Sequence, residues 1–172
     1  MIIALCGYMG SGKTTLGKML AKELNFEFCD TDDYIENTQK MTIPQIFGKY
    51  GEQYFRDLEF DALVHFKDKN NIVLSLGGGL PIADKNKTVL KEMFVVYIDS
   101  PFEDCYSRIS LSNRPIVKQK SKEQLKVHYE SRISHYKKVA NLICEGNALQ
   151  KMKEQIAKFV KEKIWKYCWL MV

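Results

Sequence analysis

Residues 7–14, Gly-Tyr-Met-Gly-Ser-Gly-Lys-Thr, have the types and spacing of a phosphate-binding loop. They fit the pattern G-x-x-x-x-G-K-[ST], and they stand between an apolar run at residues 2–6 and an amphipathic run. Glycines let such a loop turn tightly and bring its N–H groups close to phosphate oxygens. We therefore expect Lys13 to reach the β- and γ-phosphates of a nucleotide and the Thr14 hydroxyl to bind Mg²⁺. The alternative is a glycine-rich turn with an exposed lysine.

Acidic side chains follow the second apolar run of the chain. Asp30 and Asp32 are two residues apart, so in extended chain they share a side. In open α/β sheets, ligands bind beyond the carboxyl ends of the strands. One carboxylate can orient a Mg²⁺-bound water, and the other can hold an acceptor hydroxyl and take its proton. The competing interpretation is helix capping, and we expect Asp33 to cap a helix that begins near Tyr34.

Three consecutive glycines, residues 77–79, directly follow the apolar run at residues 72–76. Glycines at this point destabilise the backbone through entropy, so their presence needs a reason. One reason is the close approach of backbone N–H groups to a bound ligand. The alternative is a tight turn that ends at Pro81.

Two arginines stand on separate helical patterns. Arginines contributed by separate elements can grip a carboxylate through paired N–H donors. Arg56 and Glu59 share a helix face at i,i+3, so a surface ion pair is possible, and Arg132 and Tyr136 share a face at i,i+4. Taken singly, each arginine is typical of a solvated surface. The sequence alone does not show that the two arginines converge.

Five short apolar runs predict the strands of a parallel sheet that is covered on both faces. They are residues 2–6, 26–29, 72–76, 94–98 and 142–144. Helical patterns separate these runs, which predicts an α/β fold with right-handed crossovers.

The helix boundaries also have local signals. Ser100, followed by proline and by Glu103, predicts a capped helix start, and residues 121–124 predict a second capping box. A helical pattern continues beyond Gly51, and a final helix is expected over about 149–165. The polar segment 111–120 lies between two helical patterns and carries an arginine, so it is either a lid or an ordinary surface loop.

The composition indicates one soluble globular domain over residues 1–172, with 45% hydrophobic and 27% charged residues. The net charge of +5 suits anionic ligands such as nucleotides and is too weak to argue for nucleic acid. Five cysteines without a C-x-x-C pair favour reduced thiols in the cytoplasm. No apolar run is long enough to span a bilayer, and the opening strand and loop do not resemble a signal peptide. The apolar tail, residues 165–172, is expected to pack on the domain.

Taken in this order, these pieces resemble the shikimate kinase family. The matching pieces are residues 7–14, Asp30 with Asp32, Arg56 with Glu59, residues 77–79, Arg114 with Pro115, and Arg132 with Tyr136. The resemblance implies a three-layer α/β/α P-loop fold whose five parallel strands have the order 2-3-1-4-5, with a lid at about 111–120. It implies MgATP-dependent phosphorylation of the 3-hydroxyl of shikimate, a step in chorismate and aromatic amino-acid synthesis.

The same resemblance implies roles for individual residues. The implied catalytic residues are Lys13, Asp32 and Arg114. The implied ATP-binding residues are Gly10, Ser11, Gly12, Lys13, Thr14, Thr15, Arg108 and Arg114. The implied shikimate-binding residues are Asp32, Arg56, Gly78, Gly79 and Arg132. Thr14 and Asp30, the latter through water, are implied for Mg²⁺. The expected partners are ATP and shikimate, without nucleic acid or membrane, and the chain is expected to be a cytoplasmic monomer.

The chain departs from the family pattern mainly at the adenine end. Residues 115–117 read Pro-Ile-Val where leucines are common, Arg108 matches loosely, and residues 145–148 lack the usual Asp and Pro. Two other functions stay open from the sequence. One is another small P-loop kinase that acts on gluconate or a nucleoside monophosphate, and the other is a nucleotide-gated binding protein without transfer chemistry.

Overall fold

The central element of the protein is a parallel sheet. The structure is a computed structural model that describes residues 1–112 and 115–169. Its sheet has the order β2-β3-β1-β4-β5, and each neighbouring pair is parallel, as expected. The strands are β1 Ile2–Cys6, β2 Glu27–Asp30, β3 Ile72–Ser75, β4 Phe94–Asp99 and β5 Leu142–Glu145. These bounds agree with the predicted runs to within one residue.

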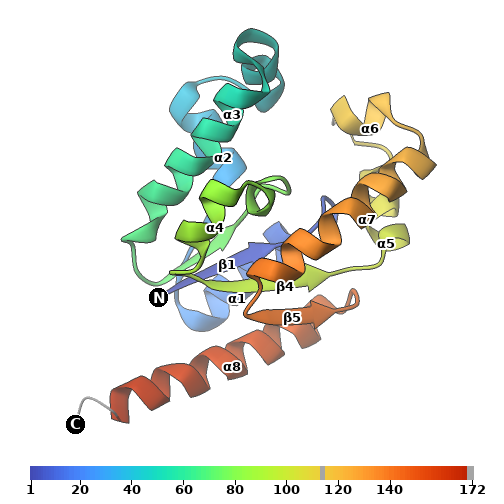
Figure 1. The fold of residues 1–172 in the computed structure, drawn as a ribbon. Helices are drawn as coiled ribbons and strands as arrows, with labels where there is room; N and C mark the ends of the chain where they lie inside the picture. Colours follow the sequence, from blue (N-terminus) through green and yellow to red (C-terminus); the bar gives the residue numbers. More distant parts are fainter. Residues whose placement is uncertain (113–114, 170–172) are drawn as a thin grey trace.

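Helices cover both faces of this sheet. They are α1 Lys13–Leu24, α2 Thr31–Gln39, α3 Ile43–Lys67, the 3₁₀ helix η1 Leu80–Ile82, α4 Asp84–Leu90, α5 Phe102–Ile109, α6 Pro115–Gln119, α7 Lys122–Val139 and α8 Leu149–Trp169. Figure 1 shows α8 on one side of the sheet and α3, α4 and α7 on the other. The predicted three-layer architecture is confirmed.

Alternate strand residues point into two separate cores. Ile3 and Leu5 pack against Leu16 of α1 and Ile156 of α8. Their neighbours along β1, such as Ala4, belong to the core under α3, α4, α5 and α7. A smaller cluster between α2 and α3 contains Ile35, Ile46, Phe55 and Ala62. Because β1 is buried on both faces, the loop that follows it is held from both layers.

Two predicted helix caps are wrong. Asp30, and not Asp33, caps α2: its side chain accepts a hydrogen bond from the N–H of Asp32 at 3.0 Å. Strand β2 runs directly into α2, so the last extended residue takes the capping position. Ser100 does not cap α5, because Pro101 is the N-cap and the Ser100 hydroxyl donates to the carbonyl of Ser11 at 3.1 Å.

Other local predictions are confirmed. Ser121 and Gln124 form a capping box at the start of α7. Helix α3 continues across Gly51, whose φ of 81° and ψ of 177° make a kink there. The final helix reaches Trp169, beyond the predicted end. Within the described residues, none of the helices has the length and apolar character to cross a membrane.

The candidate lid segment, residues 111–120, is more regular than expected because it contains α6. Arg114, the residue on which the lid prediction depends, lies outside the described residues. The apolar tail at 165–172 is likewise outside the part of the chain whose side chains the structure describes.

Candidate active site

The phosphate-binding loop connects β1 to α1. Gly7, Gly10 and Gly12 all have positive φ, as the sequence pattern predicts. The Lys13 ammonium donates to the carbonyls of Gly7 and Tyr8, each at 3.0 Å, so it lies against the loop itself. Helix α1 begins here, and its N-terminus carries partial positive charge. Loop, ammonium and helix end together suit the binding of phosphate oxygens.

Three further predicted nucleotide residues lie on or beside this loop. The Arg108 guanidinium on α5 donates to the carbonyl of Gly10 at 2.8 Å, which places it at the phosphate loop. Ser11 is 1% exposed, and its hydroxyl has no hydrogen-bond partner among the described residues. Thr15 is exposed in the first turn of α1. Beyond β5, the side-chain amide of Asn147 donates to Asp104 of α5 at 2.9 Å.

Oxygen ligands suited to Mg²⁺ meet beside the loop. The Thr14 hydroxyl donates to Asp30 Oδ2 at 3.3 Å, which joins the start of α1 to the end of β2. Hydroxyl and carboxylate oxygens are the ligands that Mg²⁺ takes from proteins at nucleotide sites, where phosphates and water complete its shell. The residues present therefore fit the metal. Asp30 both caps α2 and contributes to this pair, so capping and metal binding do not exclude each other.

The glycine turn after β3 lies close to the side chains of Asp32 and Arg56. A β-carbon at Gly77 would lie 2.5 Å from Asp32 Oδ1, and one at Gly79 would lie 2.5 Å from Arg56 Nη1. The N–H of Gly77 donates to the Thr31 hydroxyl at 2.8 Å. The glycines thus make room for side chains that approach the backbone. The predicted approach of backbone N–H groups to a ligand stays a prediction beside this reason.

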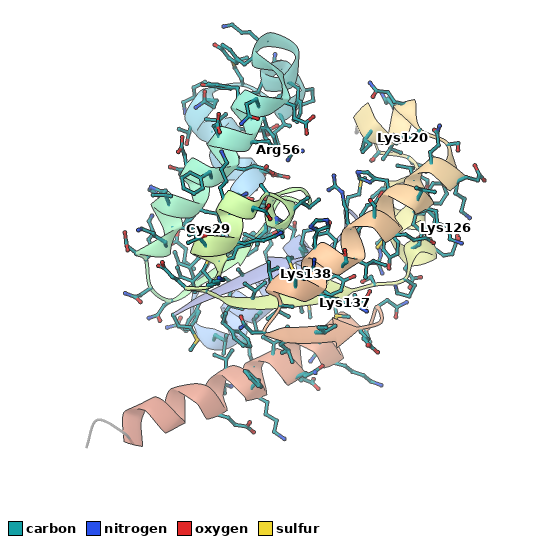
Figure 2. All side chains as sticks on the ribbon, viewed as in Figure 1. Cys29, Arg56, Lys120, Lys126, Lys137 and Lys138 are labelled. Atoms are coloured by element: carbon teal, nitrogen blue, oxygen red, sulfur yellow. The ribbon has the colours of Figure 1, made fainter. Side chains whose placement is uncertain are left out.

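Arg56 is held by two carboxylates from its own helix. Its Nη1 contacts Glu59 Oε2 at 2.7 Å, and its Nη2 contacts Glu52 Oε1 at 2.8 Å. Figure 2 shows Arg56 on the side of α3 that faces α6 and α7. A guanidinium fixed by two ion pairs loses little further freedom when it binds an anion.

The burial of Glu59 was not expected from the sequence. The alternative of an ordinary surface pair is excluded, because the Glu59 side chain is only 2% exposed. Burial raises the pKa of its carboxyl, the Arg56 ion pair opposes that rise, and Asp32 adds to it. The helical spacing could have indicated this burial, because Glu59 shares the apolar face of α3 with the buried residues Phe55 and Ala62.

Helix α7 reaches the same turn from the opposite side. Arg132 Nη1 and the Tyr136 hydroxyl both donate to the carbonyl of Gly78, at 2.9 and 2.7 Å. Burial raises the pKa of Tyr136, so its hydroxyl stays neutral and donates. Since Arg56 contacts the adjacent Gly79, the two arginines converge on neighbouring residues.

The site therefore has two halves at the carboxyl ends of parallel strands. The loop, Lys13 and the Thr14–Asp30 pair suit a magnesium-bound polyphosphate. Asp32 and the two arginines around the glycine turn suit an acceptor that carries both hydroxyl and carboxylate groups. Phosphoryl transfer depends mostly on such positioning and on electrostatic stabilisation.

Known proteins resemble this chain over nearly its whole length. A family model described as shikimate kinase matches residues 9–165. A shikimate kinase of Clostridium botulinum (strain Okra / Type B1) is 38% identical over 169 residues, which cover 95% of this chain and 97% of the relative. A shikimate kinase of Staphylococcus aureus (strain JH9) is 41% identical over 140 residues, with 80% of each chain covered. The solved structure of shikimate kinase from Acinetobacter baumannii in complex with shikimate has a TM-score of 0.87 and 34% identity, and covers 94% of this chain and 93% of its own.

Proposed function

The chain belongs to the shikimate kinase family, and we propose from this premise that it transfers the γ-phosphoryl group of MgATP to the 3-hydroxyl of shikimate. The products are shikimate 3-phosphate and ADP. The observation that carries the proposal is the convergence of Arg56 and Arg132 on adjacent glycines, beside Asp32. That arrangement matches an acceptor with one carboxylate and several hydroxyls.

In the donor half, the phosphate loop binds the β- and γ-phosphates of ATP. Lys13 lies on the loop carbonyls and neutralises charge that develops on the transferring group. Thr14 would hold Mg²⁺ directly, and Asp30 would hold it through water. When bound, the metal supplies charge neutralisation at the phosphate oxygens. Arg108 contacts the loop at Gly10, which supports its assignment to nucleotide binding.

In the acceptor half, Arg56 and Arg132 hold the carboxylate of shikimate. The backbone of Gly78 and Gly79 lies against shikimate, and Asp32 binds one of its hydroxyls. We assign Asp32 as the base that accepts the proton of the attacking 3-hydroxyl. As the new oxygen–phosphorus bond forms, the bond to the β–γ bridging oxygen breaks and ADP leaves. Arg114, which lies outside the described residues, is proposed to stabilise the transferring phosphoryl group from the lid.

Lid closure over both substrates would exclude water and limit wasteful ATP hydrolysis. We propose that the segment 111–120 closes in this way. We also propose that the protein is a cytoplasmic monomer that acts on ATP and shikimate and not on nucleic acid. The free thiols of Cys6, Cys29, Cys105 and Cys144 are compatible with a reducing compartment.

A substrate panel tests this function against its alternatives. Purified protein with MgATP is supplied with shikimate, gluconate, a nucleoside monophosphate or no acceptor, and ADP release is followed through a coupled assay. We expect ADP release that depends on shikimate alone. Turnover of gluconate or a nucleoside monophosphate in place of shikimate would favour another small P-loop kinase. Tight ATP binding without turnover on any acceptor would favour the nucleotide-gated binding protein.

A further inference from the structure

Tyr8, the second residue of the phosphate loop, connects the loop to α7. Its side chain is buried, and its hydroxyl lies 3.2 Å from the carbonyl oxygen of Leu125 and 3.0 Å from His128 Nδ1. The ring also makes edge contacts with His128 and with Tyr129. A loop residue that is more than a hundred positions away in sequence thus contacts three residues on consecutive turns of one helix.

The Tyr8 hydroxyl can form both of its polar contacts at the same time. Burial raises the pKa of Tyr8 to about 12, and burial with the nearby charges of Arg132 and Lys120 lowers the pKa of His128 to about 4. Both groups are therefore neutral at neutral pH. A hydroxyl has one hydrogen, which it donates to Leu125, so His128 satisfies the second contact by donating its Nδ1–H to the hydroxyl oxygen.

A second connection joins the same loop to the same helix. The Tyr129 hydroxyl donates to the carbonyl of Ser100 at 2.9 Å, and the Ser100 hydroxyl donates to the carbonyl of Ser11 at 3.1 Å. The loop is therefore fixed to α7 near both of its ends. This explains why Ser100 does not cap α5: its hydroxyl is used in this connection.

The two ends of the Tyr8 contact belong to the two halves of the site. The backbone carbonyl of Tyr8 accepts from Lys13, which serves the donor half. His128 lies one helical turn before Arg132, which reaches the Gly78 carbonyl in the acceptor half. A displacement of α7 relative to the loop would move Arg132 relative to Lys13.

We propose that Tyr8 is a positioning residue whose hydroxyl sets the place of α7, and with it Arg132, relative to the phosphate loop. The proposal rests on the proposed function, because it assigns Arg132 to the acceptor. The loop itself is fixed by β1 and α1, so loss of the hydroxyl releases α7 more than the loop. The loss of the hydroxyl should therefore weaken the binding of shikimate and leave the binding of ATP unchanged.

The direct test is Tyr8→Phe, which removes the hydroxyl and keeps the ring. The matched control is Tyr97→Phe, which removes another buried hydroxyl, one that donates to Asp99 of its own strand at 2.8 Å. KM for shikimate, KM for ATP, kcat and the unfolding temperature are measured for both. Because a hydrogen bond contributes about 1 kcal/mol, we expect Tyr8→Phe to raise KM for shikimate about fivefold and KM for ATP less than about twofold.

A second pair of variants separates positioning from packing. Asparagine at position 128 keeps a donor near the place of Nδ1, whereas leucine keeps only bulk. We expect His128→Asn to retain a KM for shikimate near that of the unchanged protein and His128→Leu to reproduce the effect of Tyr8→Phe.

Three results would overturn the proposal: equal rises of both KM values in Tyr8→Phe, a shikimate effect of the same size in Tyr97→Phe, or equal behaviour of the two His128 variants. Inactivity of the unchanged protein on shikimate would instead refute the proposed function, so the two failures are distinguishable.

Discussion

Arg56 lies so close to Gly79 that a β-carbon at position 79 would stand 2.5 Å from its Nη1. The guanidinium is fixed there by its ion pairs with Glu59 and Glu52. The absence of a side chain at position 79 therefore leaves the space in which the Arg56 guanidinium lies. This relationship makes the glycine turn part of the proposed acceptor site even though it contributes no side chain.

Gly79→Ala should displace the Arg56 guanidinium and leave the fold intact, because the clash involves the end of a long side chain. We expect kcat/KM for shikimate to fall roughly 10- to 100-fold. The control is Gly48→Ala in α3, where a β-carbon would meet no atom within 4 Å. It should keep normal kinetics and gain about 0.5–1 kcal/mol in free energy of unfolding. Normal shikimate kinetics in Gly79→Ala would contradict the close contact.

Glu59→Gln removes the buried counter-charge of Arg56. We expect the free energy of unfolding to fall by about 1–3 kcal/mol, because a charge-assisted hydrogen bond is lost and the guanidinium stays partly buried. Glu52→Gln is the matched control, since the Glu52 side chain is 68% exposed, and it should cost less than about 1 kcal/mol. Urea unfolding measures both variants. Equally small losses of unfolding free energy in both variants would show that the buried ion pair contributes no more to stability than the exposed one.

Asp30→Asn separates the two roles of Asp30. Asparagine caps a helix as well as aspartate does, but it brings no charge to a metal. We expect the Mg²⁺ concentration for half-maximal activity to rise several-fold while the unfolding temperature hardly changes. Asp30→Ala should lose about 1 kcal/mol of stability in addition, because the cap is gone. An unchanged Mg²⁺ dependence in Asp30→Asn would remove Asp30 from the metal site.

His128 should make stability depend on pH. Its pKa is lowered from 6.5 to about 4 by burial and by the charges of Arg132 and Lys120, so between these values the unfolded chain binds more protons than the folded one. The stabilisation is complete above pH 6.5 and is lost as the pH falls toward 4. Urea unfolding at pH 7 and pH 4.5 should show a smaller loss in His128→Asn than in the unchanged protein. Parallel losses would contradict a neutral His128 in the fold.

Much of the fold follows from local sequence signals. The five strands are short apolar runs, and the phosphate loop has a fixed pattern of glycines around Lys13, so both could be predicted almost to the residue. The strand order was expected from the family resemblance and is confirmed. The caps of α2 and α5 were less predictable, because Asp30 and Ser100 each had more than one available hydrogen-bond partner.

The acceptor half depended on tertiary contacts. The packing of α3 and α7 around the turn after β3 decides whether Arg56 and Arg132 converge. The residue spacing around each arginine carries no information about this packing. The burial of Glu59 likewise results from tertiary packing. The contact of Tyr8 with α7 was not anticipated either, since the loop pattern accepts any residue at that position.

The central claim is that this site joins the γ-phosphoryl group of ATP to the 3-hydroxyl of shikimate. Phosphorus NMR of a reaction with MgATP and shikimate measures this directly, because it observes both products and the position of the new phosphate ester. The account predicts shikimate 3-phosphate and ADP in equal amounts, with little ADP when shikimate is omitted. ADP released with inorganic phosphate, or a phosphate ester on a different hydroxyl, would contradict it.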